Sequence, residues 1–265
     1  MFYPKKSLGQ NFLIDLAVLP KIIQAAGIKK GETVLEIGPG FGILTQAILA
    51  SGAQVFAVEK DFQLVEKLRE SIKNKNLTII HQDALFFDPS NLKSYKLVAN
   101  LPFSIASPIV RKFLENPNQP EIMVVMVQKE VAKKIIAKPG DSQRGVLTLA
   151  VEFYGQAEII AEVNKNSFHP QPKIDAAIIK IKPYKDHRVG GLKQVEPKLF
   201  FRLVRAGFSS KRRQIHNSLA ATLRLSKPEV KAWLEKSNIN PQLRAEDLTL
   251  TDWLNLSQHN QNLST

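Results

Sequence analysis

A glycine-rich turn is the first stretch of the chain whose residue types and spacing point to chemistry. Gly38, Gly40 and Gly42 stand at alternate positions between a strand-like run and a helix-like one. Glycines at such a turn let the backbone pass close to a ligand, where any Cβ would collide. The dinucleotide-binding motif has a wider spacing between its second and third glycines, and Pro39 removes a backbone donor that a pyrophosphate would use. The turn therefore predicts a ligand-binding loop and disfavours NAD.

Two carboxylates stand at corresponding places further along the chain. Glu59 ends the next strand-like run, and Asp83 follows the third one. A carboxylate at the end of the second strand can accept hydrogen bonds from both hydroxyls of a ribose, and Asp83 can accept one from an adenine amino group. These residues predict an adenosine ligand without a phosphate chain, as in S-adenosylmethionine. The alternative is that one glycine turn and two acidic strand ends are ordinary features of an α/β sheet.

The sequence Asn100-Leu101-Pro102-Phe103 follows the fourth strand-like run. The 6-amino group of adenine is a poor nucleophile, because its lone pair is delocalised into the ring. We expect the Asn100 side-chain oxygen and the Leu101 carbonyl, held by the stiff Pro102, to orient this amine towards a sulfonium methyl group. Phe103 would stack on the base. Such a leaving group needs no strong general base. Viewed alone, however, the tetrapeptide is more typical of a proline-containing loop that closes a strand.

The elements that must position these residues alternate between strand-like and helix-like patterns, which is typical of an α/β sheet. Strands are expected at residues 33–37, 54–58, 78–81, 97–100 and 121–127, then antiparallel ones at 147–154, 158–163 and 176–181. Intervening helices include residues 44–51 and 62–73, and four more follow the polar segment 183–191, at residues 198–208, 214–225, 228–237 and 251–258. We therefore expect a Rossmann-like α/β domain at residues 1–184 and a small all-helical basic domain at 185–265.

Composition narrows the class of partner. The 265 residues include 37 Lys and Arg against 24 Asp and Glu, a net charge of +13, which favours a polyanion such as nucleic acid. Without cysteine there is no disulfide, no thiolate nucleophile and no Cys-based zinc site, so we expect no metal. No apolar run approaches the length of a membrane span, and residues 1–10 have no apolar stretch behind their lysines, so we expect no cleaved signal peptide. We expect a soluble, cytoplasmic protein without a membrane partner.

The cations are densest in the C-terminal third, where residues 181–265 carry 15 basic and 7 acidic side chains. Lys and Arg bind phosphates through salt-sensitive and largely sequence-independent contacts. The alternative for any single run of charges is a solvated surface. The residues that we expect to contact RNA are Arg202, Arg205, Lys211, Arg212 and Arg213.

A second aromatic residue, Phe168, opens the proline-rich segment 168–175. We expect its ring to hold the target base from the side opposite Phe103. A flipped adenine in an RNA loop is already weakly stacked, which lowers the cost of extruding it.

Four motifs together resemble one family, the KsgA-type (RsmA) ribosomal RNA adenine dimethyltransferases. They lie at residues 6–13, 36–42, 100–103 and 168–175, and the resemblance covers nearly the whole chain. It implies a class I methyltransferase fold with a helical C-terminal domain and S-adenosylmethionine as cofactor. It also implies dimethylation of two adjacent adenosines near the 3′ end of small-subunit (16S) ribosomal RNA during ribosome biogenesis, by a monomer acting on a pre-assembled 30S particle.

The resemblance further assigns cofactor contacts to particular residues. It places them on Gln10, Asn11, Leu13, Gly38, Glu59, Asp83 and Asn100, with the N-terminal ones covering the cofactor. Phe103 stands where many relatives have Tyr, so stacking is kept and any hydrogen bond from a hydroxyl is lost.

Two other functions stay open at this point. A resistance-type methyltransferase of large-subunit RNA shares the Asn-Leu-Pro-aromatic loop, although segment 168–175 and the basic stretch 211–217 favour the small-subunit enzyme. A noncatalytic RNA-binding or assembly factor on the same scaffold is the third possibility. A nicotinamide dehydrogenase is disfavoured by the glycine spacing and by the absence of a His or Tyr in a suitable local motif.

Overall fold

The computed structural model describes residues 9–184 and 195–259, so residues 6–8 of the first motif lie outside the described residues. The described chain forms two compact units, which are treated separately below. The sheet unit comprises residues 9–132 and 155–184, and the helical unit comprises residues 133–154 and 195–259.

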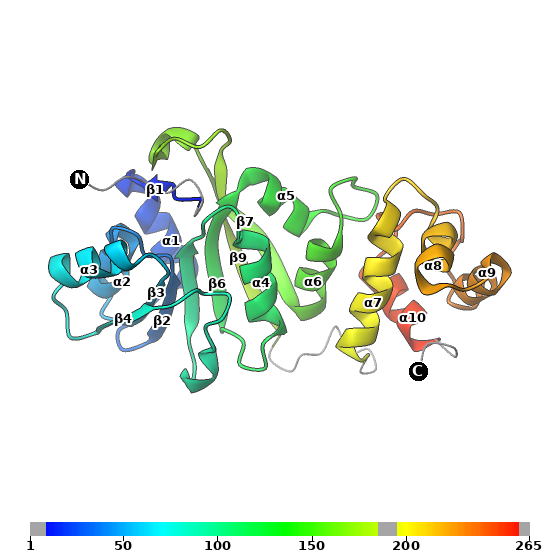
Figure 1. Ribbon diagram of the computed structural model, residues 1–265, viewed down its shortest axis with the longest axis horizontal. Helices are drawn as coiled ribbons and strands as arrows, with labels where there is room; N and C mark the ends of the chain where they lie inside the picture. The colour runs from blue at the N-terminus through cyan, green and yellow to red at the C-terminus, as the bar shows by residue number, and fades with distance from the viewer. Residues whose placement is uncertain (1–8, 185–194, 260–265) are drawn as a thin grey trace. The chain divides into compact units, whose positions relative to one another are not determined.

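The sheet unit is built on a seven-stranded sheet with the order β4-β3-β2-β5-β6-β9-β7 (Figure 1). The five strands from β4 to β6 are parallel, and β9 and β7 continue the sheet in antiparallel pairing. The strands are β2 (Thr33–Ile37), β3 (Gln54–Glu59), β4 (Leu77–His81), β5 (Lys96–Asn100), β6 (Ile122–Gln128), β7 (Gly155–Val163) and β9 (Ala176–Pro183). The predicted Rossmann-like sheet with antiparallel strands at its end is confirmed.

Helices cover both faces of this sheet. Helices α1 (Leu19–Ala26) and α2 (Ile43–Ala50) share a buried apolar cluster with alternate strand residues such as Val34 and Val98. The intervening residues are also fully buried, and in Figure 1 α4 (Ala106–Glu115) lies in front of the sheet and α1 behind it. Because central parallel strands are buried on both faces, their sequences are almost continuously apolar. Helix α3 (Phe62–Ser71) begins at Asp61, whose side chain accepts from the Gln63 N–H as an N-cap.

The strand expected at residues 147–154 is wrong, because this segment forms helix α6 (Val146–Tyr154). All residues of α6 except Thr148 and Glu152 are apolar or aromatic, so the segment carries no alternation that separates a buried strand from a buried helix. The Phe153 ring packs against the rings of Phe200 and Phe201 of α7 (Pro197–Gly207). Residues 133–154 therefore belong to the helical unit, whereas the predicted division placed them in the sheet domain.

The helical unit contains the four predicted C-terminal helices, α7, α8 (Ile215–Leu223), α9 (Lys227–Lys236) and α10 (Leu250–Gln258) (Figure 1). It also contains α6 and the second half of α5 (Lys129–Ile136). Capping boxes at Ser226 and Thr249 fix the first turns of α9 and α10.

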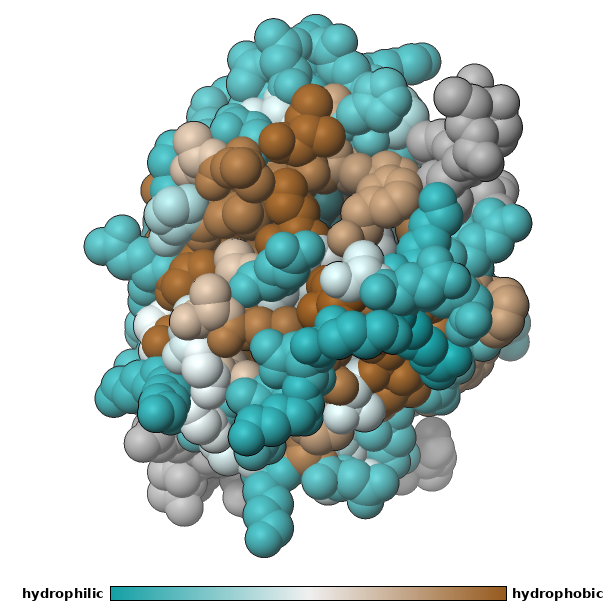
Figure 2. Space-filling model, turned by 90° about the vertical axis from the view of Figure 1, so that its left-hand side faces the viewer, coloured by the Kyte–Doolittle hydropathy of each residue, from teal (hydrophilic) through white to brown (hydrophobic). Residues whose placement is uncertain are grey.

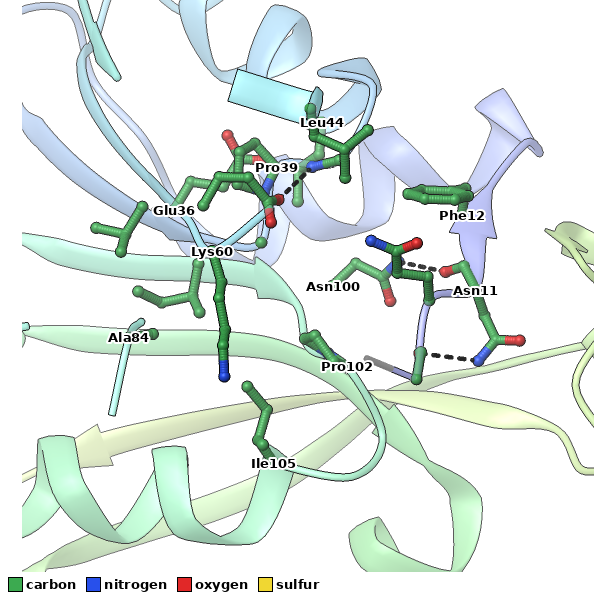
Figure 3. Close-up of a pocket in the computed structure, with 18 of the residues that line it drawn as sticks. Asn11, Phe12, Glu36, Pro39, Leu44, Lys60, Ala84, Asn100, Pro102 and Ile105 are labelled. Carbon is green, nitrogen blue, oxygen red and sulfur yellow. Dashed lines mark hydrogen bonds between the residues drawn. The ribbon is translucent and has the colours of Figure 1, made fainter. Parts of the chain in front are cut away.

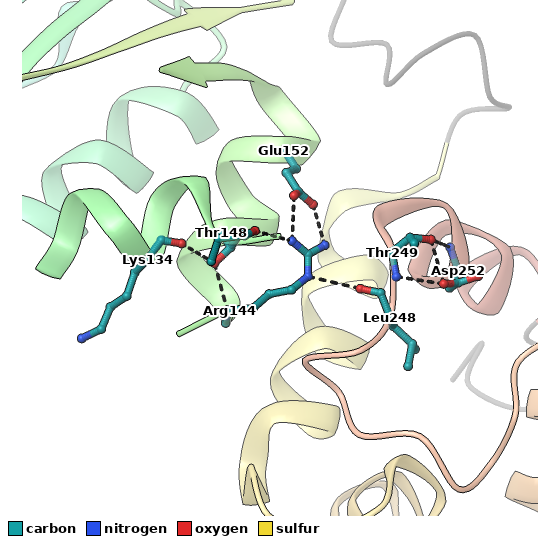
Figure 4. Close-up of polar contacts among 9 residues, drawn as sticks. Lys134, Arg144, Thr148, Glu152, Leu248, Thr249 and Asp252 are labelled. Atoms are coloured by element: carbon teal, nitrogen blue, oxygen red, sulfur yellow. Dashed lines mark hydrogen bonds and ion pairs between the residues drawn. The ribbon is translucent and has the colours of Figure 1, made fainter. Parts of the chain in front are cut away.

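Arg144 lies at the centre of the polar contacts within the helical unit (Figure 4). Its side chain is completely buried, and its guanidinium forms a two-pronged ion pair with Glu152 at 2.7 Å for each contact. The same group donates to the carbonyls of Ala137 and Leu248, so one cation joins three segments of the unit. All of these hydrogen bonds end on oxygen atoms, and together they offset the cost of burying a charged guanidinium.

Among the described residues, no helix has both the length and the apolar character to cross a bilayer.

We predict that Arg144→Met destabilises the protein by about 3–5 kcal/mol, because it leaves Glu152 and two buried carbonyls without their donor. Arg244→Met is the control, since Arg244 is half exposed and lies 3.9 Å from Glu246, a pair worth at most about 1 kcal/mol. Thermal and urea unfolding of both variants measures the difference. Equal stabilities would show that the Arg144 network contributes nothing beyond a surface pair.

Candidate active site

The candidate site is a pocket at the carboxyl ends of the parallel strands of the sheet unit (Figure 3). All seven residues that the sequence assigned to cofactor contact line this pocket, from Gln10 in the N-terminal segment to Asn100 at the end of β5. In α/β sheets ligands bind at this edge, because loops there can carry functional groups that the strands position. Residues 90 positions apart in the chain therefore face one cavity.

The glycine turn between β2 and α2 forms one wall of the pocket. Gly38, Gly40 and Gly42 all have positive φ, between 60° and 81°, which L side chains rarely adopt. A Cβ on Gly40 would lie 2.9 Å from the Phe12 ring, and one on Gly42 would lie 2.6 Å from Ile72. The turn needs glycine both for its conformation and for close packing of the chains around it.

Glu59 lies at the end of β3 and forms part of the pocket wall. Its carboxylate accepts from the N–H of Gly40 at 3.3 Å and from the N–H of Asp61 at 2.9 Å. Burial raises the pKa of Glu59, against the effect of these hydrogen bonds. A carboxylate has about four acceptor positions, so both oxygens can still accept bonds from ligand hydroxyls.

Glu36 is a pocket residue that the sequence reasoning missed, although it stands two positions before the glycine turn. It is 1% exposed, and its Oε2 accepts from the Thr45 hydroxyl at 2.6 Å. Its Oε1 is buried in the pocket wall without a hydrogen-bond partner among the described residues. Burial raises the pKa of Glu36 to about 8, and the nearby Glu59 adds to the effect. An unpartnered buried acceptor beside an open cavity fits a site built to receive a polar ligand.

Asp83 lies in the loop after β4 and faces Lys60 across the pocket wall. The two charged groups are 2.8 Å apart, and Asp83 also accepts from the Leu85 N–H. The hydrogen bond from Lys60 lowers the pKa of Asp83, so this carboxylate is charged at neutral pH. Asp83 is thus an acceptor at the place expected for an adenine contact, and Lys60 is a neighbour that the sequence did not identify.

Lys112 on α4 is a second missed residue, and it holds the same loop from outside the pocket. Its Nζ donates to the carbonyl of Ala84 at 2.9 Å and to that of Leu85 at 2.7 Å. Both carbonyls belong to residues that line the pocket. Burial lowers the pKa of Lys112. No motif marks this lysine, because its role arises only when α4 packs beside the loop.

The N-terminal segment closes one side of the pocket. Its strand β1 (Phe12–Leu13) pairs antiparallel with β8 (Phe168–His169), and the Ser167 hydroxyl donates to Asp15 at 2.9 Å. The side chain of Gln10 donates to Asp61 at 3.1 Å. Segments more than 150 residues apart in the sequence are therefore joined at the pocket rim, which explains why the N-terminal motif and segment 168–175 occur together.

Apolar side chains are exposed near this segment. Ile14 and Leu16 are 56% and 63% exposed, and Phe41, whose ring lies 4.6 Å from that of Phe12, is 45% exposed. Figure 2 shows hydrophobic residues gathered on this face of the molecule with hydrophilic residues around them. The surface beside the pocket is consequently mixed, with apolar groups between the charges.

Asn100 and the following loop enter the pocket from β5. The Asn100 amide donates to the carbonyl of Asn11 at 3.3 Å (Figure 3), and no donor to its Oδ1 is found in the described part of the chain. The N–H of Leu101 donates to the Met126 carbonyl at 3.1 Å, which fixes the peptide after the strand. Pro102 lines the pocket, whereas the Leu101 side chain is buried in the core. The predicted arrangement thus rests on the side chain of Asn100 and the backbone of Leu101.

Phe103 and Phe168, the two rings expected to hold the target base, lie next to each other. Their ring centroids are 6.3 Å apart with an interplanar angle of 66°, so the rings meet edge to face. Phe168 is only 2% exposed, and Phe103 is the half-buried ring of the pair. The sandwich of a base between the two rings stays a prediction.

The cations predicted to contact RNA are all exposed, and three of them line hollows of the helical unit. Arg202 and Arg205 on α7 line one hollow of the helical unit, and Arg213 lines another beside α8. Lys211 and Arg212 line neither of these two hollows.

Comparison with known proteins gives consistent matches over the whole chain. The family model described as "Ribosomal RNA adenine dimethylase" matches residues 1–262. A Dehalococcoides mccartyi protein named "Ribosomal RNA small subunit methyltransferase A" is 44% identical over 257 residues, which are 95% of this chain and 87% of that protein.

Two solved structures are also similar. The dimethyladenosine transferase from Plasmodium falciparum has a TM-score of 0.78 at 27% identity, covering 92% of this chain and 95% of that one. The 23S rRNA methyltransferase ErmE has a TM-score of 0.71 at 26% identity, covering 94% and 99%.

We predict that Glu36→Gln stabilises the protein relative to wild type by an amount that grows with pH. The folded-state pKa of about 8 lies above the ordinary value of 4.5, so the stability that Glu36 contributes falls as pH rises through this window. The slope is at most about 1.4 kcal/mol per pH unit, and glutamine keeps the acceptor for Thr45. Urea unfolding at several pH values measures it, with Glu70→Gln at an exposed position of α3 as control. A difference that does not change with pH would contradict the prediction.

Proposed function

Since the chain belongs to the ribosomal RNA adenine dimethylase family, we propose that it uses S-adenosylmethionine to dimethylate the 6-amino groups of two adjacent adenosines near the 3′ end of small-subunit ribosomal RNA. The family match spans residues 1–262 and identifies an rRNA adenine dimethyltransferase. The observation that carries the proposal beyond the family is the shared pocket, in which Asn100 and the predicted cofactor residues meet.

The pocket has the chemistry that S-adenosylmethionine requires. When bound, this cofactor supplies an electrophilic methyl group on a sulfonium sulfur. Glu59 would accept bonds from the ribose hydroxyls, and Asp83 from the adenine amino group. The glycine turn leaves room for close approach of the ligand, and the free Oε1 of Glu36 offers a further acceptor. Gln10, Asn11 and Leu13 would cover the ligand from the N-terminal side.

The chain's contribution to transfer is orientation of the target amine. The Asn100 Oδ1 and the Leu101 carbonyl would each accept one hydrogen bond from the 6-amino group. These two bonds would orient the nitrogen lone pair towards the methyl donor. Holding the two reactants in this geometry makes the transfer effectively unimolecular, which lowers its activation barrier. Phe103 would stack on the adenine face from one side. After the first methylation the amine keeps one N–H, so one of the two acceptors would still orient it for a second transfer once a fresh cofactor has replaced the spent one.

Small-subunit RNA is favoured over large-subunit RNA as the substrate. The Dehalococcoides relative named as a small-subunit methyltransferase is 44% identical, whereas the 23S rRNA enzyme ErmE is 26% identical. The shared fold explains the structural likeness to both kinds of enzyme.

The two units would have different roles. Residues 1–184, without the segment 133–154, would hold the cofactor and the target base, and the basic helical unit would bind rRNA through Arg202, Arg205, Lys211, Arg212 and Arg213. We further propose that the enzyme acts as a monomer in the cytoplasm, on small-subunit RNA within a pre-assembled 30S particle. A role in assembly can accompany catalysis.

Mapping of modified nucleotides tests the function directly. The full-length protein is incubated with labelled S-adenosylmethionine and small subunits that lack the modification, and in parallel with large subunits and with protein-free small-subunit RNA. Dimethyladenosine confined to two adjacent positions of the small-subunit RNA is expected. Modification of large subunits would select the other enzyme, and RNA binding without transfer would select an assembly factor.

We predict that Asn100→Ala lowers kcat by on the order of 100-fold, because one of the two acceptors that orient the amine is lost. Equilibrium dialysis with labelled S-adenosylmethionine should show much smaller losses of cofactor affinity. Full transfer by the variant would exclude the positioning role of Asn100.

We predict that Lys112→Met raises the KM for S-adenosylmethionine about ten-fold with little change in kcat at saturation, because the loop that carries Asp83 loses its two anchoring bonds. Lys93→Met, at an exposed lysine outside the pocket, is the charge-matched control. A lower kcat with an unchanged KM would argue against a role in shaping the cofactor pocket.

A further inference from the structure

The helical unit carries a groove lined by three arginines between the outer face of α7 and the end of α8. It is lined by Arg202, Arg205, Ala206, Thr222, Leu223 and Arg224, and this set is called the arginine groove below. No carboxylate is among the lining residues, and no ion pair to any of the three arginines occurs within the described part of the chain. Three positive charges are thus brought to one hollow without a protein counterion.

The positions of the three arginines are set by the backbone. Arg202 and Arg205 are three residues apart on α7, so both project from the same side of that helix. Arg224 is the C-cap of α8, and the Ser209 and Thr222 hydroxyls are 2.9 Å apart, which ties the end of α7 to the last turn of α8. The groove is therefore a fixed feature and not a chance meeting of mobile side chains.

Arg224 stands where the backbone favours glycine. Its φ is 58° and its ψ is 39°, the left-handed conformation that commonly ends a helix. Its N–H donates to the carbonyl of Ala220, a bond that glycine would make equally well with less steric cost. Only two non-glycine residues of the described chain have positive φ, and the other is Asn238. The cost of an arginine at such a position points to a use for its side chain.

We propose that the arginine groove binds the phosphodiester backbone of the substrate RNA, as a contact separate from the basic stretch Lys211–Arg213. Guanidinium groups match phosphate geometry with two parallel hydrogen bonds, so an anionic chain satisfies charges that no protein group neutralises. Arg213 lines a different hollow, with Asn217 and Lys227, which makes the two contacts physically distinct. This inference rests on the proposed function, because it takes the RNA of that reaction as its ligand.

A second explanation for Arg224 is local, since a cation at the C-terminal end of a helix is stabilised by the helix dipole. The two explanations make different predictions for RNA binding by Arg224→Gly. A purely local role predicts an equal or lower melting temperature and unchanged RNA binding. The phosphate role predicts an unchanged or higher melting temperature, through relief of the left-handed strain, together with weaker RNA binding.

The experiment measures binding of the full-length protein to labelled small-subunit ribosomal RNA over a range of KCl concentrations. For Arg224→Gly we expect affinity to fall about five- to ten-fold, as for the loss of one charge-assisted contact. The slope of log K against log salt should decrease by about 0.7–0.9, the value for one phosphate contact. Arg202→Gln, which leaves the backbone of α8 untouched, should reduce the slope by a similar amount.

Two variants serve as matched controls. Asn238→Gly makes the same backbone change at the other left-handed position and should leave the salt slope unchanged. Lys231→Ala removes an exposed charge on α9 outside the groove and should also leave it unchanged.

The proposal is wrong if Arg224→Gly and Arg202→Gln both keep the wild-type salt slope. It is also wrong if Lys231→Ala lowers the slope by as much as the groove variants do. Failure of the proposed function would appear differently, as a wild-type protein that neither binds nor methylates small-subunit RNA.

Discussion

Four parallel strands that end at one edge of the sheet bring the proposed chemistry together. The pairing of Ile37 with Val58 and of Glu59 with His81 sets the strand ends side by side, so the residues that follow each strand face a common cavity. Strand side chains alternate between faces, and a slip of one residue would exchange them. The buried apolar residues on both faces of β2, β3 and β5 fix this register. Packing of the core thus determines the geometry of the site.

That dependence explains which parts of the fold could be predicted. The five parallel strands and their turns were predicted because each is a short apolar run followed by residues with local turn preferences. Segment 146–154 was mistaken for a strand because a helix buried on most sides has the same composition as a buried strand. Its true partners are the rings of α7, about 50 residues away, and no local pattern reports a contact of that range.

In the pocket, too, features encoded locally could be predicted and those that depend on distant contacts could not. The pocket positions of Gly38, Glu59, Asp83 and Asn100 could be predicted because each lies at or just after the end of a strand, and topology then brings the strand ends to one edge. Lys112 was missed because its role depends on α4 packing beside the Ala84–Leu85 carbonyls. The burial of Phe168 against Phe103 could not be predicted either, because sequence gives the aromatic ring and not its surroundings.

The arginines of the helical unit show how burial and backbone conformation divide one residue type between structure and binding. Arg144 is completely buried, and its charge is neutralised by Glu152, so its hydrogen-bonding capacity is directed inwards. Arg224 is exposed, lacks a carboxylate partner among the described residues, and occupies a conformation better suited to glycine. Removing a buried arginine would leave its hydrogen-bond and ion-pair partners without a donor, which destabilises the fold. An exposed arginine in a left-handed conformation loses backbone stability relative to glycine, which an anion bound from outside the chain would offset.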